Sequence, residues 1–527
     1  MSAAHNVAPP AHHHHHQGNP AGNPELGPLR DLEPGTRRSA DVVVVGSGAG
    51  GAVVAATLAG AGLEVIVVEE GPMVTTDDVR RWSVAERMVR LYRDSGTSAA
   101  LGRPPLALPM GRCVGGTTTV NSGTCFRAPD AVLDGWARRG LGALSAGNLA
   151  PLFDELESVL GVREIGRDIM GGNARAAERG AAALGMRGGL IHRNERGCIG
   201  SGQCPMGCPQ GAKQDMRMTF LPRAQYAGAA IHAGVRARRL LVDDGAVRGV
   251  EADRVDVAGR TLSRARSDRI ILRAPLTVLA AGPVFTPLLL LRAGIGGPHV
   301  GRHLAVHPCS DAAGFVDERV DGWHGVQQSY WIHPEPGVTI EATFPPGGTG
   351  LRYLPLNGMP LKAAMARLGH AVLLGLMVVD GGNGRVRLLP TGQPLVTYRL
   401  GGAEAGRLVR GLAHAARVLR AAGAREVYTP LRRLPVLEAD QDPAVLERAS
   451  AADLTLVAFH PSGTARMSAL AADGVAGADG RVFGVGGVAV ADASLLPSAP
   501  GVNPQMTIMA LALHVARSLA PGRESPP

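Results

Sequence analysis

The sequence predicts an α/β protein in which a Rossmann-like domain is interleaved with a substrate domain built on an antiparallel sheet. A glycine-rich turn joins a buried apolar strand to an Ala-rich helix near residue 46, which is typical of a doubly wound nucleotide-binding unit. From Asp311 onward, short stretches of alternating polarity indicate antiparallel strands. At 527 residues the chain is also too long for one simple core, so at least two domains are expected.

Residues 1–39 differ in composition from the rest and are expected to form a disordered lead. They are rich in Pro, Gly and His, include five consecutive histidines from His12 to His16, and lack apolar periodicity. The histidines are therefore left out of the site. Arg37 and Arg38 precede an apolar run, but this run is better explained as a strand, a turn and a helix than as an export signal. Neither a secretory signal nor a membrane-spanning segment is evident, which favours a cytoplasmic protein.

The overall composition is that of an enzyme with a large core and argues against nucleic-acid binding. Hydrophobic residues make up 45% of the chain and charged residues 19%, whereas aromatic residues are only 3%, too few for binding by base stacking. The net charge is +9, but the positive residues are almost all Arg and are spread along the chain. No nucleic-acid partner is expected, and the composition does not indicate an oligomeric state.

The first element that carries chemistry is a dinucleotide-binding turn. A buried strand at residues 42–45 leads into a turn in which Gly46 permits the tight bend, Gly48 lets the backbone approach a pyrophosphate, and Gly51 lets the helix pack on the strand. The next strand ends at Glu69, at the distance where an acidic side chain can bind the ribose hydroxyls. The turn alone does not choose between NAD and FAD.

The following segment indicates flavin. The stretch GRCVGGTTTVNSGTCFRAP, residues 111–129, resembles the first signature of the glucose-methanol-choline (GMC) oxidoreductases. The resemblance implies a GMC fold and implies that four residues contact FAD: Gly115, Gly116, Thr117 and Asn121. In some members a His just before this Asn carries the flavin covalently. Val120 occupies that position here, so FAD is expected to bind without a covalent bond.

Three further stretches follow the order of the same family. Residues 278–296 resemble its second signature, and the hairpin before them, about an Asp-Gly turn, would bring the backbone of Val235 to the adenine. In the C-terminal stretch VADASLLP, the resemblance places Asp492 and Ala493 near the pyrophosphate and the ribityl chain. Asp492 has an alternative role as the cap of the turn that follows.

The resemblance also implies two catalytic residues. His460, in FHPSGTARM, would accept the hydroxyl proton of an alcohol, and Asn503 would hold the substrate oxygen. Pro504 would start a helix whose N-terminus faces the flavin. Asn503 also suits a purely structural role, because Asn at the cap followed by Pro at the first helical position is a common helix start.

A metal site is possible, but not favoured, at three clustered cysteines: Cys198, Cys204 and Cys208. Their spacing departs from the paired CxxC of zinc sites, but three thiolates could hold a three-iron cluster. Certain FAD-dependent sugar dehydrogenases of the superfamily carry a comparable trio. The stretch GCPQGAKQ looks closer to relatives without a cluster, so a reduced, packed loop and no bound metal are expected.

These elements define the expected domains. The FAD-binding domain is assigned residues 40–130, 210–305 and 455–527. Residues 131–209 and 306–454 are assigned to the substrate domain and the cysteine loop, with a helix at residues 404–422.

The expected activity is oxidation of a CH–OH group to a carbonyl by hydride transfer to flavin N5. The small-molecule substrate would be an alcohol, with some preference for an apolar one because long-chain alcohol oxidases and sterol-oxidase-like bacterial members look nearest. A sugar or a biosynthetic glycoside remains open, and either O2 or another electron acceptor could reoxidise the flavin. The alternatives are a non-redox flavin lyase or decarboxylase, and a partner-dependent dehydrogenase subunit with an iron–sulfur cluster.

Overall fold

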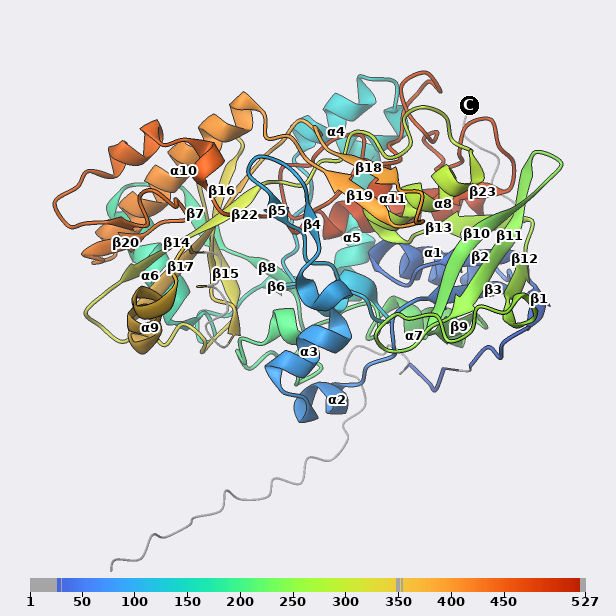
Figure 1. Cartoon of the computed structure of the whole chain (residues 1–527), viewed down its shortest axis with the longest axis horizontal. Coiled ribbons are helices and arrows are strands. Elements are labelled where there is room, and N and C mark those ends of the chain that lie inside the picture. Colours follow the sequence, from blue (N-terminus) through green and yellow to red (C-terminus); the bar gives the residue numbers. More distant parts are fainter. Residues whose placement is uncertain (1–25, 30, 347–350, 352–353, 522–527) are drawn as a thin grey trace, which may run out of the picture.

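The computed structural model describes residues 26–29, 31–346, 351 and 354–521, which form two lobes side by side (Figure 1). Residues 1–25 of the expected lead lie outside the described residues. The rest of the lead differs from expectation, because β1 (Arg37–Ser39) pairs in parallel with β12 (Ile270–Arg273) and Leu32 is buried in the core. The open edge of β12 supplies hydrogen-bond partners that the composition of this segment does not reveal.

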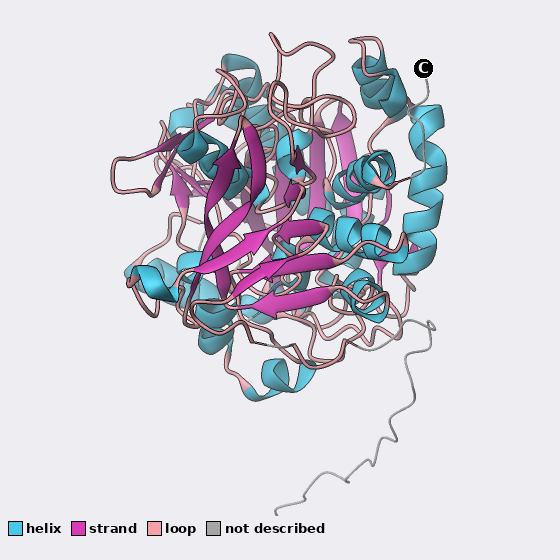
Figure 2. Cartoon of the chain, turned by 90° about the vertical axis from the view of Figure 1, so that its right-hand side faces the viewer, coloured by secondary structure: helices cyan, strands magenta, loops and turns pink. Residues whose placement is uncertain are grey.

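The first lobe is built on a parallel five-stranded sheet. Figure 2 shows the strands of the molecule with helices packed around them. Its strand order is β23 (Val488–Val490), β13 (Leu276–Leu279), β2 (Val42–Val45), β3 (Val65–Glu69), β9 (Ala230–Ala233). Every neighbouring pair is parallel. The strands are nearly continuous apolar runs, as expected for a sheet covered on both faces. They come from three separate parts of the chain, so the lobe is discontinuous in sequence.

Helices α1 (Ala49–Gly60) and α11 (Gln505–Leu519) pack against each other in this lobe. Helix α5 (Ala146–Leu160) packs on α11 and shares the core of the parallel sheet, although its residues were expected in the substrate domain. Its apolar face, which includes Leu149 and Phe153, explains the difference because α11 offers the apolar surface that buries it.

A smaller sheet, in the order β1-β12-β11-β10, lies beside the parallel sheet. Strands β10 (Val235–Asp243) and β11 (Ala246–Arg254) form the predicted antiparallel hairpin. Its turn has Asp244 at φ +47° and Gly245 at φ +71°, conformations that favour Asp and Gly.

The second lobe is built on a ten-stranded, largely antiparallel sheet. Its central strands are β14 (Cys309–Phe315), β15 (Gln328–Glu335), β16 (Val338–Thr343) and β17 (Ala371–Val378). The predicted helix at residues 404–422 is α10 (Gly402–Ala421), which packs on this sheet together with α6 (Gly171–Ala183). Strands β4 (Ala99–Ala100), β5 (Leu106–Ala107) and β22 (Leu456–Val457) join this sheet from stretches assigned to the FAD-binding domain. The two lobes therefore exchange segments.

The remaining helices are α2 (Thr76–Arg81), α3 (Val84–Leu91), α4 (Asp130–Ala137), α7 (Phe220–Tyr226), α8 (Gly282–Ala293) and α9 (Gly358–Ala366). The remaining strands are β6 (Val162–Glu164), β7 (Gly188–Leu190), β8 (His192–Asn194), β18 (Arg385–Leu388), β19 (Pro394–Thr397), β20 (Glu426–Tyr428) and β21 (Val436–Leu437). Within the described residues, no helix combines the length and apolar character needed to cross a membrane.

Candidate active site

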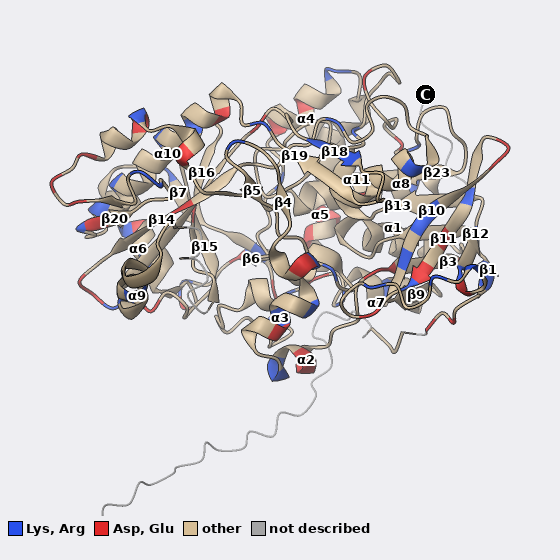
Figure 3. Ribbon diagram, viewed as in Figure 1, with Lys and Arg blue, Asp and Glu red and all other residues tan. Residues whose placement is uncertain are grey.

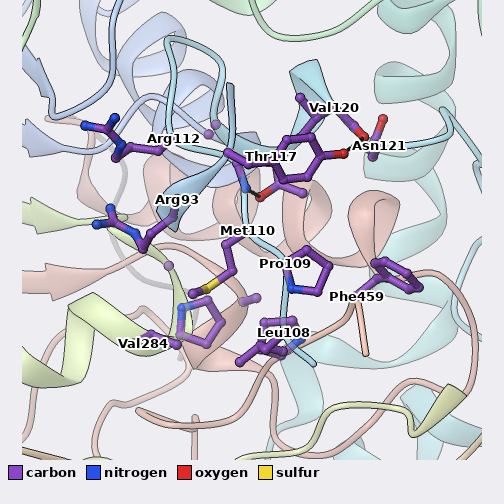
Figure 4. Close-up of a pocket in the computed structure, with 18 of the residues that line it drawn as sticks. Arg93, Leu108, Pro109, Met110, Arg112, Thr117, Val120, Asn121, Val284 and Phe459 are labelled. Atoms are coloured by element: carbon purple, nitrogen blue, oxygen red, sulfur yellow. Dashed lines mark hydrogen bonds between the residues drawn. The ribbon is translucent and has the colours of Figure 1, made fainter. Parts of the chain in front are cut away.

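A cavity of about 640 Å³ lies between the lobes and is lined by both. The parallel-sheet lobe contributes the glycine turn after β2 and the start of α11, whereas the other lobe contributes β14 to β17. Figure 4 shows Thr117, Val120 and Asn121 grouped along one part of its wall, with Leu108, Pro109 and Phe459 along another. The cavity therefore brings together segments more than 300 residues apart in the sequence.

In the glycine turn, three glycines are required by the packing of the protein and one faces the cavity. A Cβ built on Gly46 would lie 2.3 Å from the carbonyl oxygen of Ala280, and one on Gly51 would lie 2.0 Å from that of Gly46. A Cβ on Gly48 would meet only Gly116 Cα, at 3.9 Å. Gly48 is thus not required by protein packing, and the open space beside it is the cradle that a pyrophosphate needs. Gly50, which sequence reasoning did not single out, is also structural, since its Cβ would lie 1.7 Å from the carbonyl oxygen of Ala491.

Glu69 lines the cavity and also holds the turn. Its carboxylate accepts hydrogen bonds from Ser47 N at 3.0 Å, Ser47 Oγ at 2.7 Å and Gly71 N at 2.8 Å. Burial raises its pKa, and the bonds from Gly71 and Ser47 oppose that rise. Ser47 Oγ in turn accepts a bond from Gly115 N at 3.0 Å, which joins the turn to the next glycine segment. The binding of a ribose by Glu69 remains a prediction.

The second glycine segment touches the first. Gly115 and Gly116 both have positive φ, at +86° and +56°, and a Cβ on Gly116 would lie 2.9 Å from Gly48 Cα. Thr117 Oγ1 accepts a bond from Gly111 N at 3.1 Å, and the Asn121 amide donates to Gln505 Oε1. Of the four residues predicted for this segment, Gly116, Thr117 and Asn121 line the cavity, and Gly115 contacts Ser47 of the glycine turn.

Two buried cations hold this segment from behind. Lys213 Nζ donates to the carbonyl oxygens of Thr119, Asn121 and Cys204 at 2.7 to 3.1 Å. The Arg193 guanidinium donates to Cys204 Sγ at 3.2 Å. Burial lowers the pKa of Lys213. The cysteine loop therefore acts as a support for the segment around Asn121.

The described residues include no group of three His, Cys, Asp or Glu side chains placed to hold a metal ion, and Cys198, Cys204 and Cys208 are free thiols. Burial raises the pKa of the Cys198 thiol to about 11, which opposes the thiolate form that ligates iron. The described residues therefore contain no set of side chains placed to ligate an iron–sulfur cluster.

The three other predicted cofactor contacts also line the cavity. Val235 begins β10 and is buried. The Asp492 carboxylate accepts from Ser494 N at 2.7 Å, Gly282 N at 2.8 Å and the Thr286 hydroxyl. It therefore caps the turn at residues 493–495, as its alternative role predicted, and also fixes the start of α8. Ala493 follows it on the cavity wall.

His460 is paired with a second histidine that sequence reasoning missed. Nδ1 of His460 lies 3.3 Å from Nδ1 of His307, with the rings nearly perpendicular. His307 is buried at φ +47°, and its backbone N–H donates to the Asp380 carboxylate at 3.0 Å. Burial lowers the pKa of His460 to about 4 and that of His307 well below 6.5. Both rings are therefore neutral near pH 7.

The tautomer of the pair can be followed from one backbone contact. Gly501 N donates to Nε2 of His307 at 3.2 Å, and a backbone N–H can only donate. A neutral His307 then carries its proton on Nδ1, directed at Nδ1 of His460. In this arrangement the proton of a neutral His460 lies on Nε2.

The expected helix start at Asn503 and Pro504 is wrong by one position. Helix α11 begins at Gln505 with Pro504 as its cap residue, and no side chain caps it. The Asn503 side chain instead interacts with the Glu341 carboxyl of β16, which also lines the cavity, and it opposes the rise in the pKa of that carboxyl. Asn503 therefore interacts with a residue distant in the sequence and does not cap the helix. Pro504 and Asn503 both line the cavity.

Glu341 is a second site residue missed from the sequence. It is only 8% exposed, lines the cavity, and forms no ion pair within the described residues. Burial raises its pKa to about 7, and the neighbouring side chains of Gln328 and Asn503 oppose that rise. The sequence around Glu341 reads only as a β-strand and does not mark a site residue. His307 precedes a proline, but His333 and His460 do so too, so this pattern does not single out His307 either.

Several buried polar atoms at the cavity have no protein partner. They include Glu341 Oε1, Asn503 Oδ1 and Gln505 Nε2. Unsatisfied buried polar atoms are costly, so they indicate a ligand that completes their hydrogen bonds. The open space at Gly48 fits the pyrophosphate of a dinucleotide, and the unpartnered atoms fit polar groups of a ligand bound elsewhere in the cavity.

Comparison with known proteins decides the family. The GMC oxidoreductase family models match residues 88–309 and 380–512, and an FAD binding domain model matches residues 41–77. The chain belongs to the GMC oxidoreductase family. As a GMC oxidoreductase it is an FAD-binding oxidoreductase, and the GMC fold expected from the sequence is confirmed.

Individual relatives span most of the chain. The uncharacterized GMC-type oxidoreductase Rv0492c of Mycobacterium tuberculosis is 45% identical over 488 residues, which cover 90% of this chain and 75% of the relative. The long-chain-alcohol oxidase FAO4B of Arabidopsis thaliana is 31% identical, covering 91% of this chain and 67% of the relative. The 6'''-hydroxyparomomycin C oxidase of Streptomyces lividus is 30% identical, with 94% of each chain covered.

Among solved structures, pyridoxine 4-oxidase from "Mesorbium loti" superposes with a TM-score of 0.68 at 18% identity, covering 90% of this chain and 98% of the other. This likeness supports the fold.

Proposed function

We propose that this GMC oxidoreductase oxidises the CH–OH group of an alcohol to a carbonyl. The observation that carries the proposal is that His460 and Asn503 line the same cavity as the glycine turn around Gly48. Bound FAD would supply a hydride acceptor at N5. The protein groups at the cavity would bind the alcohol, orient its C–H bond and take the hydroxyl proton.

His460 is proposed as the group that takes the proton, at Nε2. It is neutral near pH 7 because burial lowers its pKa to about 4, so it has a free lone pair. Proton uptake at Nε2 needs the tautomer with the proton on Nδ1, opposite to the one that the Gly501 contact favours. That contact is long, at 3.2 Å, and the tautomer change would leave the Gly501 N–H without its acceptor, at a cost of about 1 to 3 kcal/mol. General base catalysis contributes about 10²- to 10⁴-fold, or about 3 to 5 kcal/mol, so it can offset this cost.

Asn503 is proposed to hold the substrate oxygen, with Glu341 as its positioning residue. The amide of Asn503 cannot act as a base, but its orientation decides where the alcohol lies. The interaction with Glu341 would fix that orientation.

The cavity wall gives two candidate substrate classes. Apolar alcohols, preferred from the sequence, are supported by Phe459, Leu376 and Met377 on the wall and by the alcohol-oxidase relative. A polar alcohol is supported by Gln328 and by the Oε1 atom of Glu341, which has no protein partner; both suit a substrate with further hydroxyl or amino groups. The relative named for a hydroxyparomomycin fits this second class.

FAD is proposed to bind without a covalent bond, and O2 or another electron acceptor would complete the cycle. We favour alcohol oxidation by the chain itself over the lyase and the partner-dependent alternatives, because His460 and Asn503 line one cavity.

The test is anaerobic flavin reduction by a panel of alcohols, followed by stopped-flow absorbance. Decanol represents the apolar class, and a polyol and an amino alcohol represent the polar class. Wild-type flavin should bleach with one class, and His460→Ala should keep its FAD while bleaching about a hundredfold more slowly or worse. Bleaching of the His460→Ala flavin at the wild-type rate would exclude His460 as the base. A flavin that no alcohol bleaches would favour the non-redox alternative.

A further inference from the structure

A second, smaller pocket of about 480 Å³ lies outside the active-site cavity. It is lined by the segment at Arg302, the loop at residues 382–384, the strand pair β18 and β19, and the residues that follow β19. Strands β18 and β19 are antiparallel and lie beside α8 (Figure 1).

Four arginines converge on this pocket: Arg302, Arg385, Arg387 and Arg399. All four side chains are exposed, and none forms an ion pair within the described residues. Positively and negatively charged residues are interspersed along the ribbon over the rest of the molecule (Figure 3). No Asp or Glu lines the pocket itself, so its positive charge is not neutralised there.

The strand pattern directs two of these side chains outward. On β18 the exposed Arg385 and Arg387 alternate with Val386, which is buried in the core of the second lobe. Because side chains alternate across a strand, both guanidinium groups lie on the solvent side of the same strand. Thr397 and Asn383 add uncharged hydrogen-bonding groups to the lining.

The nearest carboxylates behind the pocket already have partners. Asp380 is buried and accepts from the Tyr398 hydroxyl at 3.0 Å and from His307 N at 3.0 Å. Glu404 is buried and accepts from Gly381 N at 2.9 Å. These groups hold the local backbone and do not reach out to the four arginines.

His303 also lines the pocket and is neutral near pH 7. Burial, and after it neighbouring positive charges that include Arg466, Arg302 and Arg385, lower its pKa to about 4. The positive charge of the pocket therefore comes from its four arginines, which favour an anion.

We propose that this pocket is a binding site for a small polyanion, with at least two closely spaced phosphate or carboxylate groups. Arg guanidinium groups bind both kinds of group through paired hydrogen bonds, and a single chloride or acetate would leave most of the positive charge unmatched. The volume of about 480 Å³ accommodates a diphosphate or a tricarboxylate.

A chain of hydrogen bonds links the pocket to the pair of histidines at the active site. Tyr398 lines the pocket and donates to Asp380, which holds the backbone of His307, and His307 contacts His460. Strand β19 also contributes Pro394 and Val396 to the active-site cavity. A ligand in the pocket would thus share a wall with the active site.

The test is direct binding by isothermal titration calorimetry at low ionic strength, with inorganic pyrophosphate and citrate as the probes. Wild-type protein should bind one probe saturably, and the affinity should fall as salt is added. The tighter of the two distinguishes a phosphate ligand from a carboxylate ligand. The double variant Arg385→Gln and Arg387→Gln should bind at least tenfold more weakly.

A matched control keeps the result specific. Arg264→Gln and Arg266→Gln removes two exposed arginines with the same spacing and the same change in net charge, from the loop between β11 and β12. This control should bind like the wild type. Equal weakening in both double variants, or no saturable binding by the wild type, would overturn the proposal.

Vesicles that contain phosphatidylserine test the competing explanation, a contact with an anionic membrane surface. The proposed site would be replaced by a membrane contact if three results are found together. The wild type sediments with these vesicles, the Arg385→Gln and Arg387→Gln variant does not, and the wild type shows no saturable binding of pyrophosphate or citrate. Arg385→Lys and Arg387→Lys, which retains the charge, should keep part of the pyrophosphate affinity if that affinity depends on both charge and paired hydrogen bonds.

Discussion

At the scale of single residues, the least expected group at the active site is Glu341. A buried carboxyl normally has a cation or several strong donors, yet this one has only neutral amides beside it. Its cost to folding indicates a functional reason for its presence.

The raised pKa of Glu341 predicts how stability depends on pH. In the unfolded chain the carboxyl ionises near pH 4.5, whereas in the folded protein it keeps its proton up to about pH 7. Between these values the unfolded state binds fewer protons, so the free energy of unfolding falls as pH rises. The loss across this window is on the order of 3 kcal/mol.

Glu341→Gln should remove this loss, which urea unfolding of the FAD-free protein at pH 5 and pH 7 can measure. The variant should lose less stability than the wild type between the two values. Glu164→Gln serves as the control, since Glu164 is exposed and forms no ion pair in the described part of the chain. An unchanged difference in Glu341→Gln would mean that Glu341 is ionised in the folded protein.

Residue-scale sequence reasoning succeeded where a pattern is local and failed where a partner is distant. The glycine turn, the segment at Asn121 and the block at His460 all lie at the cavity as expected. Asn503 was expected to cap a helix as well, but its partner Glu341 lies on a strand of the other lobe. His307 acquires its role from folding alone, because it meets His460 across 153 residues of chain.

At the scale of elements, the turn between β2 and α1 separates folding from cofactor binding. Gly51 is required by the packing of α1 on β2, whereas Gly48 faces open space in the protein itself. Substitutions at Gly51 and Gly48 therefore test folding and cofactor binding separately.

Gly48→Ala should fold normally but bind FAD at least tenfold more weakly, because its methyl group would occupy the space where the pyrophosphate approaches. Gly51→Ala should lower the melting temperature of the FAD-free protein, since its Cβ would overlap the Gly46 carbonyl. Circular dichroism on heating and FAD titration by fluorescence measure the two effects. Full FAD affinity in Gly48→Ala would show that the pyrophosphate lies elsewhere.

Element boundaries were harder to predict than element types. The parallel strands, the β10–β11 hairpin and helix α10 were expected, because each has its own apolar periodicity. Strand β1 and the placement of α5 were not, because each depends on a surface supplied by a distant element. Such dependence on tertiary partners is invisible in a local pattern.

At the scale of the whole molecule, the two lobes exchange segments and share one cavity. A ligand that fills the cavity contacts both lobes and should stabilise them together. The melting temperature should therefore rise with FAD concentration in a single transition, and the stabilisation should reach about 2.7 kcal/mol at FAD one hundredfold above its Kd. Differential scanning calorimetry checks this. Two transitions, of which only one shifts, would mean that FAD contacts a single lobe.

The mode of FAD attachment is also a property of the assembled molecule. Val120 lies on the cavity wall, at the position where family members that bind their flavin covalently have His. Acid precipitation should therefore release all of the yellow flavin into the supernatant. Flavin that stays with the precipitate would indicate a covalent bond to another residue.

The discontinuous parallel sheet has a consequence for biosynthesis. A ribosome must translate as far as residues 488–490 before β23 can join β13, and further still before Asn503 and the start of α11 exist. The strands made first must wait, with one sheet edge open, while several hundred residues are added. Cofactor loading is therefore a late event, and a nascent chain halted before β23 would leave the ribosome without the edge strand and unable to retain its flavin.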